Sequence, residues 1–267
     1  MSPRSYLFVP GDRPERLDKA CAAGADAVIV DLEDAVTPER KASAREVVTQ
    51  WLAGGGRACV RVNGTDTQWF EDDCALLQHP GVLAAVLPKA ERAEQLALLA
   101  ERGRPGLPLL PIVETALGLC NARELARAPG VERLMFGSVD FQLDCGILGD
   151  GDELLFARSE LVIASAAARI DAPVDGVTVA IHDLEQLQAD TRRARQLGFG
   201  AKLCIHPKQV APVNQGFQPD DEEVAQARAI VSAVEAAAGV GAINLNGKLI
   251  DRPVIERARK ILEWAVA

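Results

Sequence analysis

Short apolar runs alternate along the chain with longer stretches in which apolar residues recur every three or four positions. Short runs rich in Val, Ile and Leu are typical of strands buried on both faces. The longer stretches have the period of amphipathic helices. The expected strands are 6–9, 27–30, 58–62, 82–87, 109–113, 134–136, 176–179 and 201–205, and the expected helices among them are 14–23, 38–52, 91–101, 115–127, 153–170 and 183–197.

Eight strand–helix units in succession predict an α/β fold, namely a closed (β/α)8 TIM barrel. An open doubly wound sheet is the alternative, because the sixth and seventh units are the least regular. After the eighth strand come a helix expected over 219–238, a Gly/Asn-containing loop over 239–247 and an amphipathic helix over 253–266. We therefore expect a catalytic barrel domain over residues 1–238 and a C-terminal helical lid segment over residues 239–267.

The composition favours a well-packed enzyme-sized barrel and argues against several other classes of protein. Of the 267 residues 48% are hydrophobic and 25% are charged, which suits a full core and not a disordered chain. The net charge of −9, without a basic stripe, argues against a nucleic-acid partner. No apolar run has the about 18 residues of a membrane span, and the N-terminus lacks a signal-peptide pattern. The cysteines form no C-x-x-C pair, so we expect reduced thiols in the cytoplasm.

Polar residues follow most of the expected strands, at the end where a barrel carries its chemistry. Glu114 follows the fifth strand and Asp140 the sixth, so two carboxylates are expected on neighbouring strand ends. Without a cation they would repel each other and one pKa would rise. A hard divalent ion resolves this, because two carboxylates with water and substrate oxygens often hold Mg²⁺. The other polar residues at this end are Asp31, Glu33, Asp34, Arg61, Asn63, Lys89 and His206, of which His206 is expected to be a structural hydrogen bonder.

Several of these residues lie in motifs that occur in one order along nearly the whole chain. The motifs are Asp31-Leu32-Glu33-Asp34, Arg61-Val62-Asn63, Leu87-Pro88-Lys89, Glu114-Thr115-Ala116, His206-Pro207-Lys208 and Gly247-Lys248-Leu249-Ile250-Asp251. Together they make the chain resemble the citrate lyase β-subunit family, within the wider group of HpcH/HpaI-type aldolases and malyl-CoA lyases. That family is a (β/α)8 barrel that binds Mg²⁺ and acts on acyl-thioesters.

The resemblance implies roles for individual residues. Glu114 and Asp140 match the family's metal ligands for Mg²⁺, with Mn²⁺ as a substitute, and Arg61 matches its substrate-carboxylate contact. Asp31 and Glu33 match acids that surround metal-bound water.

Asp251 matches an acid on a C-terminal lid that reaches the site of a neighbouring subunit. This implies a homo-oligomer, commonly a trimer or a dimer of trimers.

The implied reaction is the cleavage or formation of a 3-hydroxyacyl-CoA thioester, such as malyl-, citramalyl- or citryl-CoA, to acetyl-CoA and a 2-oxo acid. Mg²⁺ would lower the pKa of the substrate hydroxyl. Arg61 and Glu114 would bind the acid end of the substrate, and Asp251 would exchange a proton with the enolate carbon. Departures from the family pattern, such as Val139 directly before Asp140, leave the acyl group open.

The CoA phosphates are expected over the first strand–helix turn, where Arg4, Arg13 and Lys19 are the nearby basic residues. A solvated helix face is the equal alternative for these three side chains.

Other functions stay open. One is a class II-type aldolase of free 2-oxo acids. Another is a citrate lyase β subunit that acts within a multi-subunit complex with an acyl carrier protein, and a third is a non-catalytic binding module. A class I aldolase would need a desolvated lysine at a strand end, for which Lys89 is the obvious candidate.

Overall fold

A computed structural model describes residues 2–237, 242–245 and 247–266. They fall into two compact units, Ser2–Asn214 and Gln215–Ala267. The expected domain boundary between residues 238 and 239 lies outside the described residues, as do residues 239–241 and 246 of the loop expected to hinge the lid. The helix expected over 219–238 groups with the C-terminal unit.

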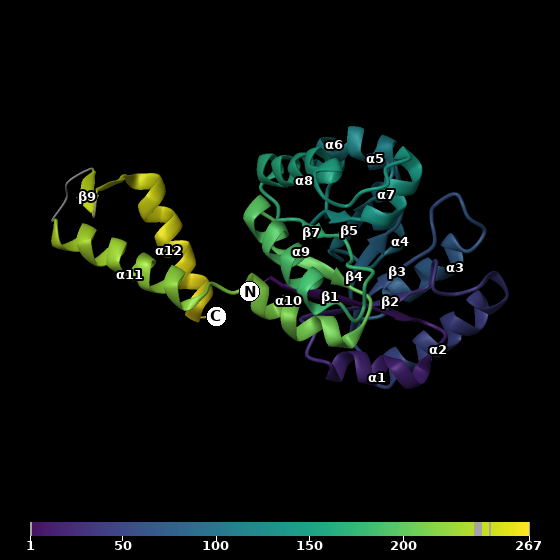
Figure 1. The fold of residues 1–267 in the computed structure, drawn as a ribbon. Coiled ribbons are helices and arrows are strands. Elements are labelled where there is room, and N and C mark those ends of the chain that lie inside the picture. Colours follow the sequence, from purple (N-terminus) through teal and green to yellow (C-terminus); the bar gives the residue numbers. More distant parts are fainter. Residues whose placement is uncertain (1, 238–241, 246, 267) are drawn as a thin grey trace. The chain divides into compact units, whose positions relative to one another are not determined.

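The first unit is a closed barrel of eight parallel strands in sequence order, with helices in the connections (Figure 1). The (β/α)8 fold expected from the sequence is therefore confirmed, and the open sheet is excluded. The strands are β1 Ser5–Pro10, β2 Ala27–Asp31, β3 Ala58–Arg61, β4 Val82–Leu87, β5 Leu109–Val113, β6 Met135–Phe136, β7 Val174–Asp175 and β8 Ala201–Cys204. The seventh strand ends before the apolar run 176–179 that was expected to form it.

The helices of this unit lie outside the barrel, and some also form part of the rim at the carboxyl ends of its strands. They are α1 Pro14–Ala22, α2 Lys41–Ala53, α3 Phe70–Cys74, α4 Ala93–Arg102, α5 Ala116–Cys120, α6 Ala122–Arg127, α7 Ser138–Cys145, α8 Leu155–Ala168, α9 Leu184–Leu197 and α10 Val210–Phe217. The sequence patterns did not indicate α3, α7 or α10. The single helix expected over 115–127 is divided at Asn121, whose side-chain amide donates to the Glu91 carbonyl at 2.7 Å.

Side chains from alternate strand positions fill the barrel interior, as the two-residue period of a strand requires. The buried interior cluster consists of Tyr6, Ala27, Ile29, Cys59, Ala84, Val86, Leu110, Ile112, Met135, Val174, Ala201 and Leu203, with Phe8 and Val177 packed against it. The barrel is therefore a closed apolar core and not a pore, and this core forms a floor beneath anything bound at the carboxyl ends of the strands.

The second unit is a pair of helices with a short hairpin between them. Helix α11, Asp221–Ala236, contacts α12, Arg252–Val266. Strands β9, Ile243–Leu245, and β10, Lys248–Ile250, pair antiparallel. Asp220 begins α11 with a capping box in which its side chain accepts from the backbone N–H of Glu223. No described helix is both long and apolar enough to cross a membrane.

Candidate active site

The side chains that face the barrel interior are apolar along the strands and become charged at the carboxyl ends of the strands. Ala27 and Ile29 of β2 point inward, and Asp31 continues their alternation at the strand end. Cys59 is followed in the same way by Arg61 of β3, and Leu110 and Ile112 of β5 are followed by Glu114. Strand geometry alone therefore aims these three charged side chains into the barrel mouth above the core.

Arg61 lies directly beside Asp31 in the barrel register. Its Nε and Nη2 donate to the two carboxylate oxygens of Asp31 at 2.7 and 2.6 Å, and its Nη1 lies 2.9 Å from Glu33 Oε2. Burial opposes the charge on Arg61, but the Asp31 carboxylate outweighs it and raises the pKa of Arg61. The guanidinium is thus fixed, charged and stacked over the Phe8 ring, with 4.8 Å from its central carbon to the ring centroid. Such a fork is built to grip a carboxylate.

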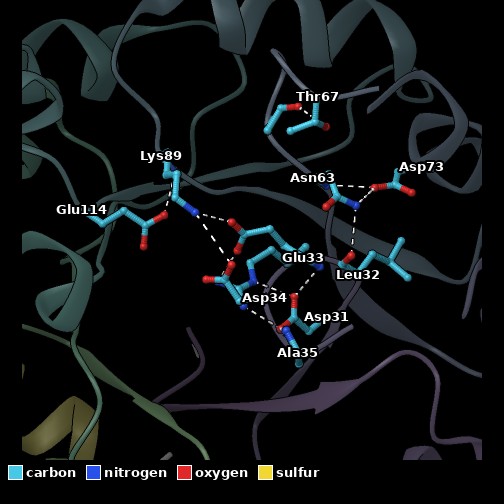
Figure 2. A network of polar contacts seen from close by, with 12 residues as sticks. Asp31, Leu32, Glu33, Asp34, Ala35, Asn63, Thr67, Asp73, Lys89 and Glu114 are labelled. Atoms are coloured by element: carbon cyan, nitrogen blue, oxygen red, sulfur yellow. Dashed lines mark hydrogen bonds and ion pairs between the residues drawn. The ribbon is translucent and has the colours of Figure 1, made fainter. Parts of the chain in front are cut away.

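Lys89 joins Glu33 to a further carboxylate at this end of the barrel, Glu114 (Figure 2). Its backbone N–H donates to Glu114 Oε1 at 2.6 Å, and its ammonium donates to Glu33 Oε1. Burial opposes the charge on Lys89, but the bond and charge of Glu33 outweigh it, so the pKa of Lys89 is raised. Burial raises the pKa of Glu33, while Arg61 and Lys89 act in the opposite direction. The ammonium is therefore committed to an ion pair and is unsuited to Schiff-base chemistry, which needs a neutral amine.

Glu114 is 2% exposed, and Asp140 comes from the first turn of α7. Burial raises the pKa of Glu114 to about 8; the Lys89 N–H bond opposes this rise and the charge of Asp140 adds to it. The backbone at Gly137 passes so close that an added Cβ would lie under 3.0 Å from Glu114. Glu114 is thus a buried carboxylate beside a second acid, and only glycine fits at the residue that packs against it. This arrangement fits a divalent cation.

One cavity of about 450 Å³ collects these side chains at the carboxyl ends of the strands. Its ionisable lining consists of the carboxylates Asp31, Asp34, Glu114 and Asp140 and the guanidinium groups Arg16 and Arg61. Four negative and two positive groups give −2 when all are ionised. A substrate anion would be repelled by this balance, whereas a divalent cation would neutralise it.

Among the described residues, no cluster of three or more His, Cys, Asp or Glu side chains could hold a metal ion. Glu33 pairs with Arg61 and Lys89 and does not line the cavity. Glu114 and Asp140 could hold a cation here if water or substrate supplied its remaining ligands.

Lys41 holds the backbone of the turn that carries Asp31 and Glu33. The sequence patterns did not single out this lysine as functional. Its buried ammonium donates to the carbonyl oxygens of Leu32 and Glu33, both at 2.9 Å, and to Asn63 Oδ1 at 2.6 Å. The Asn63 side chain in turn donates to the Leu32 carbonyl at 3.0 Å. These contacts fix the backbone from which both counter-ions of Arg61 project.

The basic residues expected to meet CoA phosphates lie in different places. Arg4 directly precedes β1, at the amino end of the barrel, where its side chain pairs with Asp26 at 2.9 Å. A phosphate at the mouth of the cavity is out of its reach, because strand β1 separates the two. Arg13 and Lys19 are exposed on the turn after β1 and on α1, whereas Arg16, which the sequence patterns did not single out, lines the cavity itself.

Asp251 lies in the C-terminal unit and caps α12, since its side chain accepts from the Val254 N–H at 3.4 Å. Its role at an active site stays a prediction. His206 begins a short helical turn, where its Nδ1 accepts from the backbone N–H of Lys208 at 3.1 Å, as expected of a structural residue.

Comparison with known proteins gives full-length relatives. The chain is 40% identical to a citrate lyase subunit beta-like protein of Deinococcus radiodurans, over 97% of this chain and 96% of the relative. It is 35% identical to a (3S)-malyl-CoA thioesterase of Cereibacter sphaeroides, over 99% and 95% of the two chains.

A solved structure agrees with these relatives. The Mycobacterium tuberculosis protein CitE, crystallised with magnesium, acetoacetate and coenzyme A, matches with a TM-score of 0.88 and 33% identity, covering 99% of this chain and 98% of that one. A sequence model of the HpcH/HpaI aldolase/citrate lyase family matches residues 4–207. The chain belongs to the HpcH/HpaI aldolase/citrate lyase family, and the expectation of a carbon–carbon lyase is confirmed.

Proposed function

We propose that this protein is a Mg²⁺-dependent lyase that cleaves, or in reverse forms, a 3-hydroxyacyl-CoA thioester whose products are acetyl-CoA and a 2-oxo acid. One observation carries the proposal: a single cavity is lined both by the clamped guanidinium of Arg61 and by the acid pair Glu114 and Asp140. The malyl-CoA thioesterase of Cereibacter sphaeroides and the CoA-bound mycobacterial protein support a CoA thioester as substrate.

Arg61 provides the anchor for the acid end of the substrate. Two of its five N–H donors bond to Asp31 and Nη1 lies beside Glu33, so donors on Nη1 and Nη2 remain for a substrate carboxylate. The apolar floor formed by Phe8, Ile112 and Leu203 keeps water from the bond that breaks.

Glu114 and Asp140 would hold the cation. When bound, the cation supplies Lewis-acid stabilisation of the negative charge that develops as the hydroxyl becomes the carbonyl of the oxo acid. Glu114 needs a cation to stay ionised near neutral pH, because burial has raised its pKa to about 8. The Lys89 N–H donates to the Oε1 atom of Glu114, and this bond would fix the orientation of the carboxylate before substrate binds.

Cleavage moves one proton overall: the substrate hydroxyl loses a proton as the carbonyl of the oxo acid forms, and the carbon that leaves as the methyl of acetyl-CoA gains one. We assign this transfer to Asp251 of a neighbouring copy in a homo-oligomer, a trimer or a dimer of trimers, with the second unit as lid. Mixing Asp251→Asn subunits with Glu114→Gln subunits should then restore part of the activity that each variant lacks. Mixed oligomers that stay inactive would contradict an exchange of residues between subunits.

The cavity of about 450 Å³ has room for a small acyl group but not for a whole CoA thioester, so the nucleotide of CoA would lie outside it. Arg16 on the lining, with Arg13 and Lys19 beside it, would face the phosphates. A cytoplasmic location completes the proposal, because all six cysteines are free thiols, which persist in a reducing compartment.

The test is a panel of malyl-, citramalyl- and citryl-CoA, assayed with Mg²⁺ and with EDTA, in which acetyl-CoA, oxo acid and free CoA thiol are all measured. We expect acetyl-CoA and oxo acid in equal amounts, with Mg²⁺ only, and no turnover by Glu114→Gln. Full activity in EDTA would refute the cation site. Free thiol without oxo acid would assign thioester hydrolysis, and turnover of free hydroxy acids alone would assign the CoA-independent aldolase.

A further inference from the structure

Lys89 has an unusual backbone for a residue that is not glycine. It follows β4 with a φ of 48°, and among the described non-glycine residues only Arg169 shares a positive φ. This left-handed conformation turns its N–H toward Glu114, while the side chain runs to Glu33. The peptide that follows is fixed as well, because the Ala90 N–H donates to the Ile112 carbonyl at 3.0 Å. A strained conformation held from both sides indicates a function for its geometry.

The contacts of Lys89 form a chain that crosses the site. Arg61 binds Glu33, Glu33 binds the Lys89 ammonium, and the Lys89 N–H binds Glu114. The substrate anchor Arg61 and the cation ligand Glu114 are therefore linked through Glu33 and Lys89, and Figure 2 shows the part of this chain from Glu33 through Lys89 to Glu114. Glu33 is nearly buried, with a side chain 9% exposed, and without the ammonium one of its oxygens would lose its partner.

We propose, on the basis of the function above, that Lys89 is a positioning residue that separates the carboxylates of the site by role. Its backbone N–H holds Glu114 in position for the cation, and its ammonium holds Glu33 beside Arg61. Without that ammonium, Glu33 becomes a third carboxylate able to turn toward the cation, and a positive charge near the cation disappears. Both changes strengthen cation binding while they loosen the substrate anchor.

The experiment measures Mn²⁺ affinity of the EDTA-treated full-length protein by the electron paramagnetic resonance signal of free Mn²⁺, and KM and kcat for the thioester. Lys89→Gly keeps the N–H and favours the positive φ but removes the ammonium. We expect it to bind Mn²⁺ about three- to tenfold more tightly and to raise KM about tenfold. Lys89→Arg keeps a positive charge, so its Mn²⁺ affinity and its KM should both be close to those of wild type. Arg169→Gly, which removes a cation and a positive-φ side chain at the C-cap of α8, is the matched control and should change neither the Mn²⁺ affinity nor KM.

A merely structural role predicts the opposite sign, since a distorted site binds metal less tightly. Unchanged or weaker Mn²⁺ binding by Lys89→Gly, with binding by wild type intact, would overturn the role of Lys89 and leave the proposed function standing. Wild type that binds no Mn²⁺, or Glu114→Gln that binds it equally well, would overturn the cation site and the role of Lys89 with it. Lys89→Ala should melt below Lys89→Gly, because alanine disfavours the left-handed backbone; equal melting would refute the backbone part of the proposal.

Discussion

Glu114→Gln should make the cation-free protein more stable at alkaline pH, although it removes a residue proposed to be essential. In the unfolded chain this carboxyl ionises near its ordinary value of 4.5, whereas burial holds the pKa of the folded carboxyl at about 8. Between these values the folded state keeps a proton that the unfolded state has lost. Stability therefore falls as pH rises through this window and then levels off. Glutamine has no proton to lose, so the variant escapes this loss.

The size of the effect follows from the two pKa values. The gap between 4.5 and about 8 corresponds, at about 1.36 kcal/mol per pH unit, to roughly 5 kcal/mol. Relaxation of the site and entry of water reduce this figure, so we expect roughly 3–5 kcal/mol at pH 9 and almost nothing at pH 4.5. For a chain of this size that is a difference in melting temperature on the order of 10 °C.

The assay is thermal unfolding of wild type and Glu114→Gln in EDTA at several pH values from 4.5 to 9, repeated with Mg²⁺. Glu124→Gln on α6 is the matched control, because it makes the same chemical change at an exposed position. It should show no pH-dependent gain. Mg²⁺ should raise the melting temperature of wild type alone and so narrow its gap to Glu114→Gln. Equal melting of wild type and Glu114→Gln at pH 9 in EDTA would show that Glu114 ionises without cost, and would refute the argument from burial.

Other variants test neighbouring parts of the site. Gly137→Ala should lower kcat/KM about 100-fold, because the new Cβ forces Glu114 to move by about 1 Å, with a modest loss of melting temperature as the second measurement. Arg61→Lys should raise KM for acidic substrates roughly 10- to 100-fold with an unchanged circular dichroism spectrum; an unchanged KM would exclude the anchoring role. Arg16→Ala should raise KM for CoA thioesters about two- to fivefold while Arg4→Ala leaves it unaltered, and the reverse order would contradict the placement of the nucleotide.

The barrel and the end that carries its chemistry could be predicted because both depend on local pattern. Eight apolar runs at strand length lead to a barrel, and a charged residue that ends such a run must face either the interior or the helices. For Asp31, Arg61 and Glu114, the alternation that begins in the apolar core also gives the direction. A count of alternate positions along each strand would have shown from sequence that these three share the interior.

The partners of these residues could not be predicted, because they depend on how loops from distant segments meet. Nothing in the sequence marks Lys89 as left-handed or tells which of its groups meets Glu114. Arg4 and Arg16 lie on either side of the same strand, and only the boundaries of β1 decide which of them reaches the mouth. The helix that carries Asp140 follows a glycine and is too short for its period to be recognised in the sequence.

The filled interior of the barrel also has a kinetic consequence. A molecule bound on the floor formed by Phe8 and Leu203 cannot depart along the barrel axis, because side chains occupy it below. In the proposed reaction the oxo acid, held by Arg61, lies beneath the thioester, so acetyl-CoA must depart first. Synthesis then has a compulsory order, with the oxo acid entering before the thioester. Product inhibition of cleavage should be competitive for the oxo acid and noncompetitive for acetyl-CoA.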